Sequence, residues 1–285
     1  MLSRIQKQIV IGGVFGVFLF GVVAIIITLL PLRKEVVEPT CFDGIQNQNE
    51  DGTDCGGACI SCKAAAERLL QDIIIYWAQA FPVKQGLYDF AAYIENPNFS
   101  YGGEEIVYRF VAYDMDGREV GSFDGTTFIL PHEKKYIIAP QSGGLDRTPA
   151  STTFDIQSIA WQKLTNFSDP GLYVEERLFA ARPDAPGTYA QGSGTVVNGS
   201  PYNVRSIEVA FIAFDSSGNP LAVNRSEIET VRSKERRFVK VVWPQSFAGV
   251  VDDFSVWAYS NFFANENFLS SHGTSQRFQE YYIND

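Results

Sequence analysis

All four cysteines of the chain lie in one 22-residue segment, at Cys41, Cys55, Cys59 and Cys62. Thiols this close together serve either as crosslinks or as metal ligands. Cys59 and Cys62 have the CxxC spacing of a zinc half-site, but Cys41 and Cys55 lie fourteen positions apart and supply no second half-site. The spacing therefore favours two disulfide bonds, for which three pairings stay open. Disulfides persist in oxidising compartments, which predicts an extracytoplasmic location.

The same segment carries oxygen-bearing side chains that could hold calcium. The run Asn47-x-Asn49-x-Asp51-Gly52 matches the first half of an EF-hand loop, which places oxygen ligands at its first, third and fifth positions. The twelfth position is Ala58, where an EF-hand has a bidentate glutamate. We therefore expect a weaker calcium site or a plain turn-rich loop. The candidate ligands are Asp43, Asn47, Asn49, Asp51 and Asp54.

The sequence offers little for catalysis. It has two histidines, His132 and His272, in separate regions, and no GxSxG, P-loop or GxGxxG motif. Three acidic pairs could supply the two carboxylates of a glycan hydrolase: Glu104-Glu105, Glu175-Glu176 and Asp252-Asp253. We expect no catalytic residues and no enzyme, and keep an envelope hydrolase acting on glycan as the alternative. Carboxylates clustered in one cleft would favour the hydrolase, and scattered ones would favour binding.

Charge argues against nucleic acid as a partner. The chain has 33 acidic and 23 basic residues, which gives a formal net charge of −10. A field of this sign repels phosphate.

A repeat organises the elements that would position these residues. Phe110-Val111-Ala112-Tyr113-Asp114 returns as Phe211-Ile212-Ala213-Phe214-Asp215, and a glycine turn follows each copy. Asn96 precedes the first copy as Asn198 precedes the second. The order and spacing indicate two copies of one domain. Its repeated core residues are Phe110, Asp114, Phe211 and Asp215.

Apolar residues within each copy alternate with a period of two, which is the signature of a strand with one buried face. Further β-rich runs follow at hairpin spacing, so the sequence predicts a mainly β protein with two tandem antiparallel sandwiches. The alternating sets are Ile106, Tyr108, Phe110 and Ala112, and then Ile207, Val209, Phe211 and Ala213.

The repeated motif resembles the one that names the FxLYD family. Both copies have alanine where the motif has leucine, and the second has Phe214 in place of tyrosine. The resemblance covers roughly residues 83–265. It implies immunoglobulin-like β-sandwiches in a prokaryotic envelope protein and brings no catalytic residues. The pattern from Cys41 to Cys62, with its DGxxN and DCGGxCxxC parts, also resembles a short cysteine-rich module of prokaryotic surface proteins.

Residues Ile9 to Leu30 are 22 in a row without a charge. A helix of this length spans about 33 Å, enough to cross a hydrocarbon core of about 30 Å. A cleaved signal peptide is the alternative, but no small-x-small site follows the run. The sequence predicts an uncleaved, single-pass signal anchor with a cytoplasmic N-terminus. The basic residues at the two ends nearly balance, so the cysteines decide the orientation.

An amphipathic helix is expected over residues 63–82. Ser61 can cap its start and Pro82 lies at its end. Its apolar stripe at helical spacing comprises Leu69, Leu70, Ile73, Ile74, Trp77 and Ala80.

The expected organisation runs from a small cytoplasmic tail to a large extracytoplasmic part. We expect a non-catalytic scaffold, adhesion or assembly protein whose partners are the membrane and other envelope proteins. The predicted segments are a cytoplasmic tail (1–8), an anchor (9–30), a linker (31–40), the cysteine module (41–62), the helix (63–82), the first sandwich (83–165), a connector (166–187), the second sandwich (188–270) and a C-terminal tail (271–285).

Overall fold

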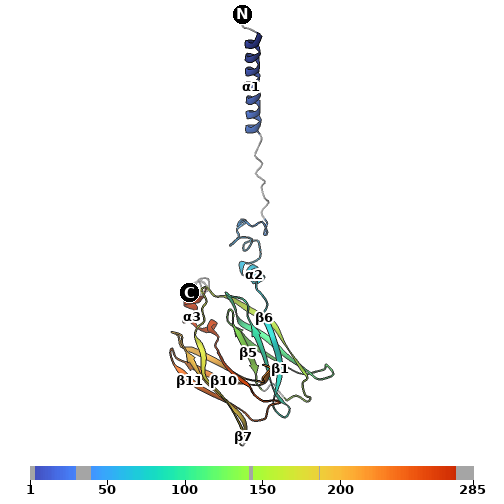
Figure 1. Ribbon diagram of the computed structural model, residues 1–285, viewed down its shortest axis with the longest axis vertical. Coiled ribbons are helices and arrows are strands. Elements are labelled where there is room, and N and C mark those ends of the chain that lie inside the picture. Colours follow the sequence, from blue (N-terminus) through green and yellow to red (C-terminus); the bar gives the residue numbers. More distant parts are fainter. Residues whose placement is uncertain (1–3, 30–39, 141–143, 186, 274–285) are drawn as a thin grey trace. The chain divides into compact units, whose positions relative to one another are not determined.

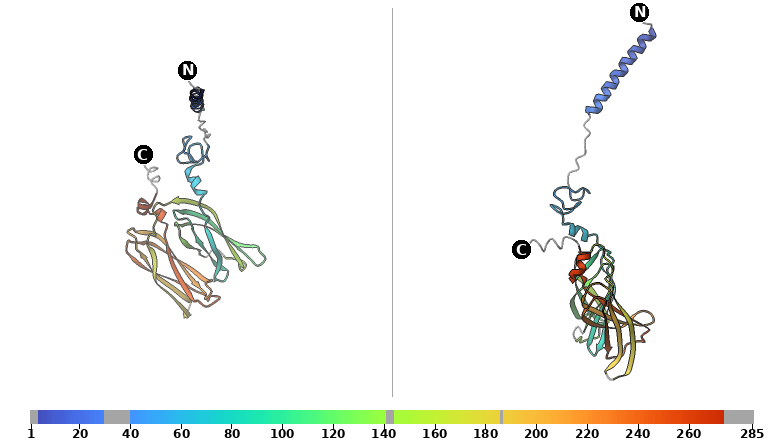
Figure 2. Two further views of the ribbon diagram at one scale, coloured as in Figure 1. Left: turned by 45° about the horizontal axis from the view of Figure 1, so that its top comes forward. Right: turned by 90° about the vertical axis from the view of Figure 1, so that its left-hand side faces the viewer.

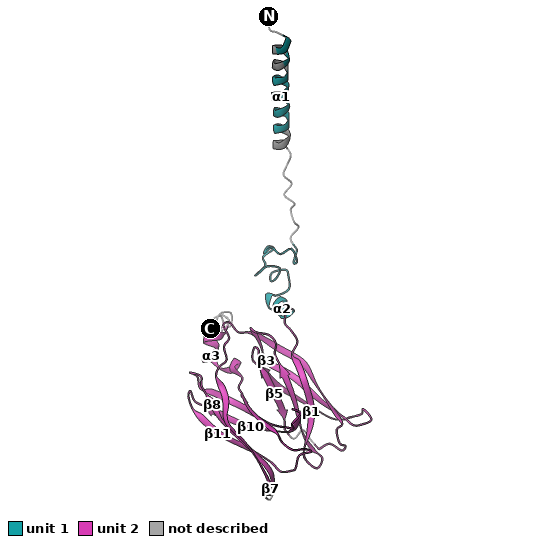
Figure 3. Ribbon diagram, viewed as in Figure 1, with its two compact units in different colours: residues 1–68 teal, residues 69–285 magenta. Residues whose placement is uncertain are grey.

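The computed structural model describes residues 4–29, 40–140, 144–185 and 187–273. The predicted linker up to residue 39 and the predicted tail beyond residue 273 lie outside the described residues. The chain divides into two compact units, Met1–Arg68 and Leu69–Asp285 (Figure 3).

The first unit contains helices α1 (Arg4–Leu29) and α2 (Cys62–Glu67), with the cysteine module before α2. In the part of the chain that the structure describes, no helix combines the length and the apolar character needed to cross a membrane.

The helix predicted over residues 63–82 is wrong for most of its length. Its start is confirmed, because the Ser61 side chain accepts a hydrogen bond from the Ala64 amide at the N-terminus of α2. That helix ends at Glu67, and strand β1 (Ile74–Lys84) follows. The run Ile73-Ile74-Ile75-Tyr76-Trp77 is β-branched and aromatic, so its strand preference outweighed the helical stripe. Pro82 is tolerated because β1 is an edge strand.

The described residues of the second unit form twelve strands in four three-stranded antiparallel sheets, so the predicted mainly β fold is confirmed (Figure 1). The first six strands after residue 73 form sheets β1-β2-β5 and β4-β3-β6, and the last six form β11-β8-β7 and β10-β9-β12. Besides β1, the strands are β2 (Leu87–Glu95), β3 (Tyr101–Tyr113), β4 (Glu119–Ile129), β5 (Lys134–Ala139), β6 (Ser151–Lys163), β7 (Leu172–Ala185), β8 (Thr188–Asn198), β9 (Val204–Phe214), β10 (Pro220–Val231), β11 (Arg236–Trp243) and β12 (Asp253–Tyr259).

The two halves have the same strand order, because β7 to β12 repeat β1 to β6 one by one. Each half is one sandwich, as the repeat predicted. The predicted boundaries start too late: β1 brings the first sandwich forward to residue 74, and β7 brings the second forward to residue 172. Most of the predicted connector 166–187 is therefore a strand.

Each sandwich has its own apolar core, and the repeated phenylalanines are at the centre of both. Phe110 and Phe211 are fully buried, with Phe110 stacked on Phe90 and Phe211 stacked on Phe254. The alternating residues of β3 and β9 point into these cores, as the period of two predicted. The core of the second sandwich extends into the 3₁₀ helix η1 (Phe262–Ala264) and helix α3 (Glu266–His272).

The two sandwiches pack against each other through their inner sheets, β1-β2-β5 and β10-β9-β12. The sequence did not predict this contact. A third apolar cluster joins them, including Phe81, Ala91 and Ile138 from the first sandwich and Ala210 and Ile212 from the second. Both faces of β9 are buried for this reason. The four sheets thus form four layers, with β4-β3-β6 and β11-β8-β7 outermost (Figure 2).

Candidate functional site

The cysteine module is closed by two disulfides, Cys41–Cys59 and Cys55–Cys62, and the structure has no free cysteine. The prediction of disulfides over a zinc site is confirmed. The longer bridge spans 18 residues and the shorter spans 7. The shorter bridge ties the loop to the first residue of α2.

Three of the predicted calcium ligands, Asp43, Asn47 and Asp54, form side-chain hydrogen bonds within the module. Asp54 accepts hydrogen bonds from the amides of Asp43 and Gly44, at 3.0 Å each. Asp43 accepts from the Thr40 and Ile45 amides and from the Asn47 side chain, and these bonds hold the pKa of its carboxyl below the usual range. These carboxylates fold the loop by accepting backbone hydrogens, as in Asx turns.

Among the described residues, one group of three acidic, thiol or imidazole side chains lies close enough to hold a metal: Cys41, Glu50 and Cys59. Both of its sulfurs are consumed by the disulfide between them. Glu50 is buried and accepts hydrogen bonds from the Asn47 and Asp54 amides. The calcium residues Asn49 and Asp51 do not belong to this group, and calcium binding stays a prediction of the sequence.

The repeated aspartates shape the hairpins that follow β3 and β9. Asp114 accepts hydrogen bonds from the amides of Asp116 and Arg118, and Asp215 accepts the same pair from Ser217 and Asn219. The backbone bond from Arg118 is the main cause of the lowered pKa of Asp114. Each aspartate closes an Asx turn, so this part of the repeat is structural.

Two buried asparagines, at the ends of β2 and β8, each connect loops and strand ends within their own sandwich. Asn96 and Asn198 are fully buried. Asn198 donates to the carbonyl oxygens of Tyr202, Val231 and Arg232 at 2.7, 3.0 and 3.1 Å. Asn96 makes the matching bonds to Tyr101 and Leu130 in the first sandwich. The repeat in the sequence matched Asn96 with Asn198 but did not indicate that they bind backbone carbonyl groups.

The three acidic pairs considered for hydrolysis are scattered. They lie on β3, on β7 and at the start of β12, in separate sheets or strands. The pair on β7 is neutralised by Arg236, which bonds Glu175 at 2.5 Å and Glu176 at 3.1 Å.

A cleft of about 580 Å³ opens between the two sandwiches, and we name it the intersandwich cleft. Its lining includes three carboxylates that the sequence did not single out together: Glu95, Glu133 and Asp169. His132 and Phe99 stack at 4.5 Å beside them. This cleft is the place where a pair of catalytic carboxylates could lie.

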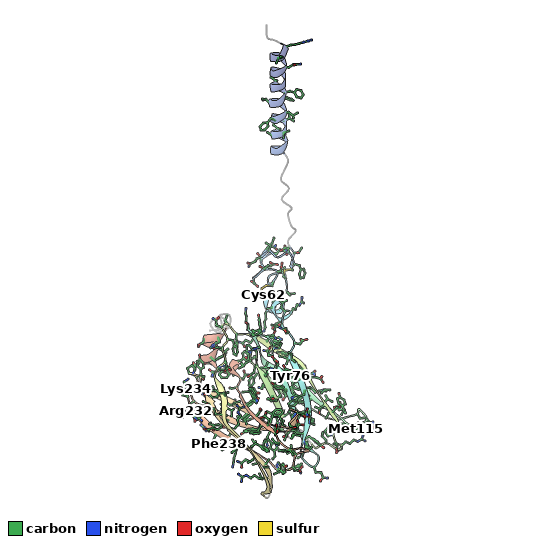
Figure 4. The ribbon with its side chains drawn as sticks, viewed as in Figure 1. Cys62, Tyr76, Met115, Arg232, Lys234 and Phe238 are labelled. Atoms are coloured by element: carbon green, nitrogen blue, oxygen red, sulfur yellow. A yellow bond between two sulfur atoms is a disulfide. The ribbon has the colours of Figure 1, made fainter. Side chains whose placement is uncertain are left out.

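Each of these carboxylates has a partner within the fold. Glu95 accepts a hydrogen bond from the Tyr76 hydroxyl, which is the main cause of its lowered pKa, and its carboxylate pairs with Lys134 at 3.4 Å. Asp169 accepts from the Gly171 amide at 2.7 Å. Tyr76, labelled in Figure 4, is about half exposed, at 48%.

Glu133 is the carboxylate with the most perturbed acidity, because burial raises its pKa to about 7. Its side chain accepts from the Leu130 amide at 2.8 Å. In the second sandwich Glu235 accepts from the Arg232 amide at 2.8 Å in the same way. The repetition of this contact in both copies indicates that Glu133 closes a turn.

The outer face of sheet β11-β8-β7 has exposed apolar side chains in adjacent rows, and we call it the β7–β11 face. Cross-strand pairing places Tyr173, Leu178, Phe238 and Val242 on one side of the sheet, with exposed fractions of 46%, 62%, 62% and 44%. Charged residues from β7 and β11 lie between and beside them. Figure 4 shows Phe238 on the outer side of the sandwich.

Comparisons with known proteins do not assign the chain to a family. No family model and no curated protein matches the chain. Solved structures with a likeness include a red sea bream transglutaminase, at 11% identity, 69% coverage of this chain and a TM-score of 0.20. A β-glucuronidase from glycoside hydrolase family 2 matches at 13% identity over 57% of this chain, with a TM-score of 0.18. A putative β-galactosidase from Bacteroides fragilis matches at 11% identity over 65%, with a TM-score of 0.17.

The chain spans 32%, 21% and 34% of the lengths of these three structures. Likenesses this weak carry no argument about fold or activity.

Proposed function

We propose that this protein is a non-catalytic, membrane-anchored extracytoplasmic protein that binds a protein partner through the β7–β11 face. Its role is that of a scaffold, adhesion or assembly component of the envelope. The observation that carries the proposal is the exposure of four large apolar side chains on one side of an outermost sheet. Large exposed apolar patches typically mark interaction sites, and these four side chains, one in each of four successive cross-strand rows, supply the apolar part of the proposed one.

The chemistry of the face favours a protein as the partner. Phe238 and Tyr173 supply aromatic contact area, and Leu178 and Val242 supply aliphatic surface, which is the composition found at the cores of protein interfaces. Arg236, enriched as a residue type at protein interfaces, lies in the same rows. Fold alone does not assign function, so the proposal depends on these side chains.

The anchor and the location rest on the sequence. The uncharged run from residue 9 to residue 30 is the proposed signal anchor. The two disulfides support an oxidising compartment for the part of the chain that follows it. The similarity of both sandwich motifs to the FxLYD family agrees with this location.

The hydrolase alternative is weaker because the carboxylates of the intersandwich cleft are occupied. Glycoside hydrolysis requires two carboxyl groups directed at one substrate bond. Glu95 is held by Tyr76 and Lys134, and Glu133 closes a turn that the second sandwich repeats. The cleft thus has three carboxylates but no pair that is left for substrate.

The test is crosslinking in native membranes followed by identification of partners, with wild type compared with Phe238→Glu. Phe238 is mostly exposed, so the change should alter the stability of the sandwich by no more than about 0.5 kcal/mol. We expect a partner that is recovered with wild type and lost with the variant. The matched control is Met115→Glu, which charges a large apolar residue in the first sandwich that is 89% exposed, against 62% for Phe238. Recovery that is the same for all three proteins would contradict the proposal.

A further inference from the structure

The feature that the proposed function leaves unexplained is a fully buried lysine at the boundary of the two sandwiches. Lys135 begins the buried part of β5 and has no exposed surface. Its Nζ lies 3.2 Å from the centroid of the Phe128 ring and 5.3 Å from that of Tyr259. The Nζ atom also lies 3.2 Å from Oε2 of Glu208, which is on β9 of the other sandwich.

The surroundings of Nζ do not suit an ammonium ion. A lysine ammonium has three hydrogens to donate, yet Lys135 Nζ is buried and forms no geometrically acceptable hydrogen bond. Burial lowers the pKa of Lys135, which favours the neutral amine. A neutral amine held in an apolar pocket is a nucleophile.

A carboxyl group and a source of protons lie beside this amine. Glu208 presents its carboxyl group to Nζ across the sandwich boundary, with about a third of its side chain exposed. A second acid, Glu133, lies two residues before Lys135 in the chain, and its charge opposes the effect of burial on the pKa of Lys135. Burial raises the pKa of Glu133 to about 7, so this acid holds a proton near neutral pH.

We propose that Lys135 and Glu208 form an intramolecular amide bond that joins the two sandwiches covalently. The lone pair of the neutral Nζ attacks Cδ of the Glu208 carboxyl group in its protonated form (–COOH), and a C–N bond forms. Glu133 gives its proton to the departing oxygen and receives a proton from Nζ, and the C–O bond breaks with loss of one water. Lys135 and Glu208 are converted to one secondary amide, and Glu133 ends as it began. No oxidant, reductant or other co-reactant takes part.

The product removes the mismatch that the separate side chains leave. An amide nitrogen carries one hydrogen, whereas a neutral amine at this place leaves two N–H groups without acceptors, and an ammonium would leave three and bury a charge. The bond would also hold the inner sheets together independently of the apolar cluster between them. A protein that bears load between a membrane and a partner gains from such a link, although the chemistry does not depend on the partner.

The decisive experiment is the intact mass of the full-length oxidised protein, purified in detergent. We expect the mass to be lower, by one water molecule, than that of the chain with two disulfides. Fragmentation of the linked peptide should assign the bond to Lys135 and Glu208. A folded protein with the mass of the two-disulfide chain would overturn the proposal, whichever function the protein has.

Three variants separate the amide from other water losses. Lys135→Met and Glu208→Ala should each restore the full mass, whereas Lys134→Met, which changes the neighbouring exposed lysine, should keep the loss. Aspartyl-glycine sequences can also lose water by forming a succinimide. Hydroxylamine cleaves a succinimide but leaves a secondary amide intact. Water loss that persists in Lys135→Met would overturn the assignment, and circular dichroism identifies any variant that fails to fold.

The role of Glu133 has its own test. Glu133→Gln should lower the crosslinked fraction, and Glu133→Asp should restore it, because aspartate supplies a proton and glutamine does not. An unchanged crosslinked fraction in Glu133→Gln would remove Glu133 from the reaction.

Discussion

The buried asparagine at the end of β8 offers the sharpest test of the fold. Asn198 is fully buried, and its side-chain amide donates to three carbonyl oxygens. Its side-chain oxygen accepts from the amide and the hydroxyl of Ser200, at 3.0 and 2.6 Å. One side chain therefore satisfies backbone groups from the loops on both sides of it.

Asn198→Ala leaves these backbone groups without their partner. A hydrogen bond contributes about 1 kcal/mol net, and an unsatisfied buried group costs about 1–3 kcal/mol. Because the three carbonyl bonds share one donor group, we expect a total loss of about 3–5 kcal/mol. Asn267→Ala, at an exposed position on α3, is the matched control and should change stability by no more than about 0.5 kcal/mol.

Asn198→Asp refines the test, because it keeps the shape of the side chain but replaces the NH2 donor with an oxygen and introduces an ionisable group. The carboxylate would face three carbonyl oxygens, which raises the pKa of the introduced acid in the folded state. The destabilisation should therefore grow as pH rises through and above the ordinary pKa of aspartate. Urea unfolding at several pH values measures both variants. A loss below about 1 kcal/mol for Asn198→Ala, or a pH-independent loss for Asn198→Asp, would refute this account of the asparagine.

Three further predictions concern the acid in the cleft, the disulfides and the core. Burial raises the pKa of Glu133 from 4.5 to about 7, so the contribution of its protonated form to stability is largest below pH 4.5 and is lost as pH rises toward 7. Glu133→Gln should therefore flatten the pH dependence of the free energy of unfolding in urea between these two values. An unchanged pH profile would refute the assignment. Each disulfide should contribute about 2–4 kcal/mol to the stability of the cysteine module, so reduction should increase hydrogen exchange in residues 41–62. The amides of both sandwiches should stay protected, because neither sandwich contains a cysteine. Loss of that protection on reduction would contradict the prediction. Phe211→Ala should cost about 3–5 kcal/mol in thermal or urea unfolding, and a cost below about 1 kcal/mol would place the residue outside a tightly packed core.

The repeat made the sandwich architecture predictable from sequence. Phe110 and Phe211 lie at matched positions in β3 and β9, and both are buried as the alternating pattern required. The disulfides were also predictable, because a lone CxxC half-site leaves zinc incomplete. The pairing of Cys41 with Cys59 was not, since spacing allows every combination.

The segment after α2 shows where local pattern fails. Ile73, Ile74 and Trp77 fit a helical stripe and a strand equally well, because several apolar residues in a row satisfy both periods. The pairing of β1 with β2, the next strand in the chain, decided the outcome and placed the segment at the edge of sheet β1-β2-β5. A helical periodicity counted within residues 63–82 alone does not include this partner strand.

The boundary between the sandwiches could not be predicted for the same reason. Ala210 and Ile212 lie on the second face of β9, and nothing in the sequence pattern indicated that another sheet covers them. Lys135 is the extreme case. Its counterpart in the second sandwich, Arg237, is exposed, so two similar residues in one repeat have opposite environments. Glu133 became noticeable only when the cleft brought it beside Asp169.

The central claim is that the β7–β11 face binds a protein partner outside the cytoplasm. The most direct measurement places a photocrosslinking amino acid at position 238 of the full-length protein in native membranes, with position 115 as the control. Both sites are exposed and lie in different sandwiches, so a crosslinker at position 238 contacts partners of the β7–β11 face and one at position 115 does not. The account predicts one discrete crosslinked protein from position 238, reduced by Leu178→Glu, and none from position 115. The same products from both positions, or no product from position 238, would contradict it.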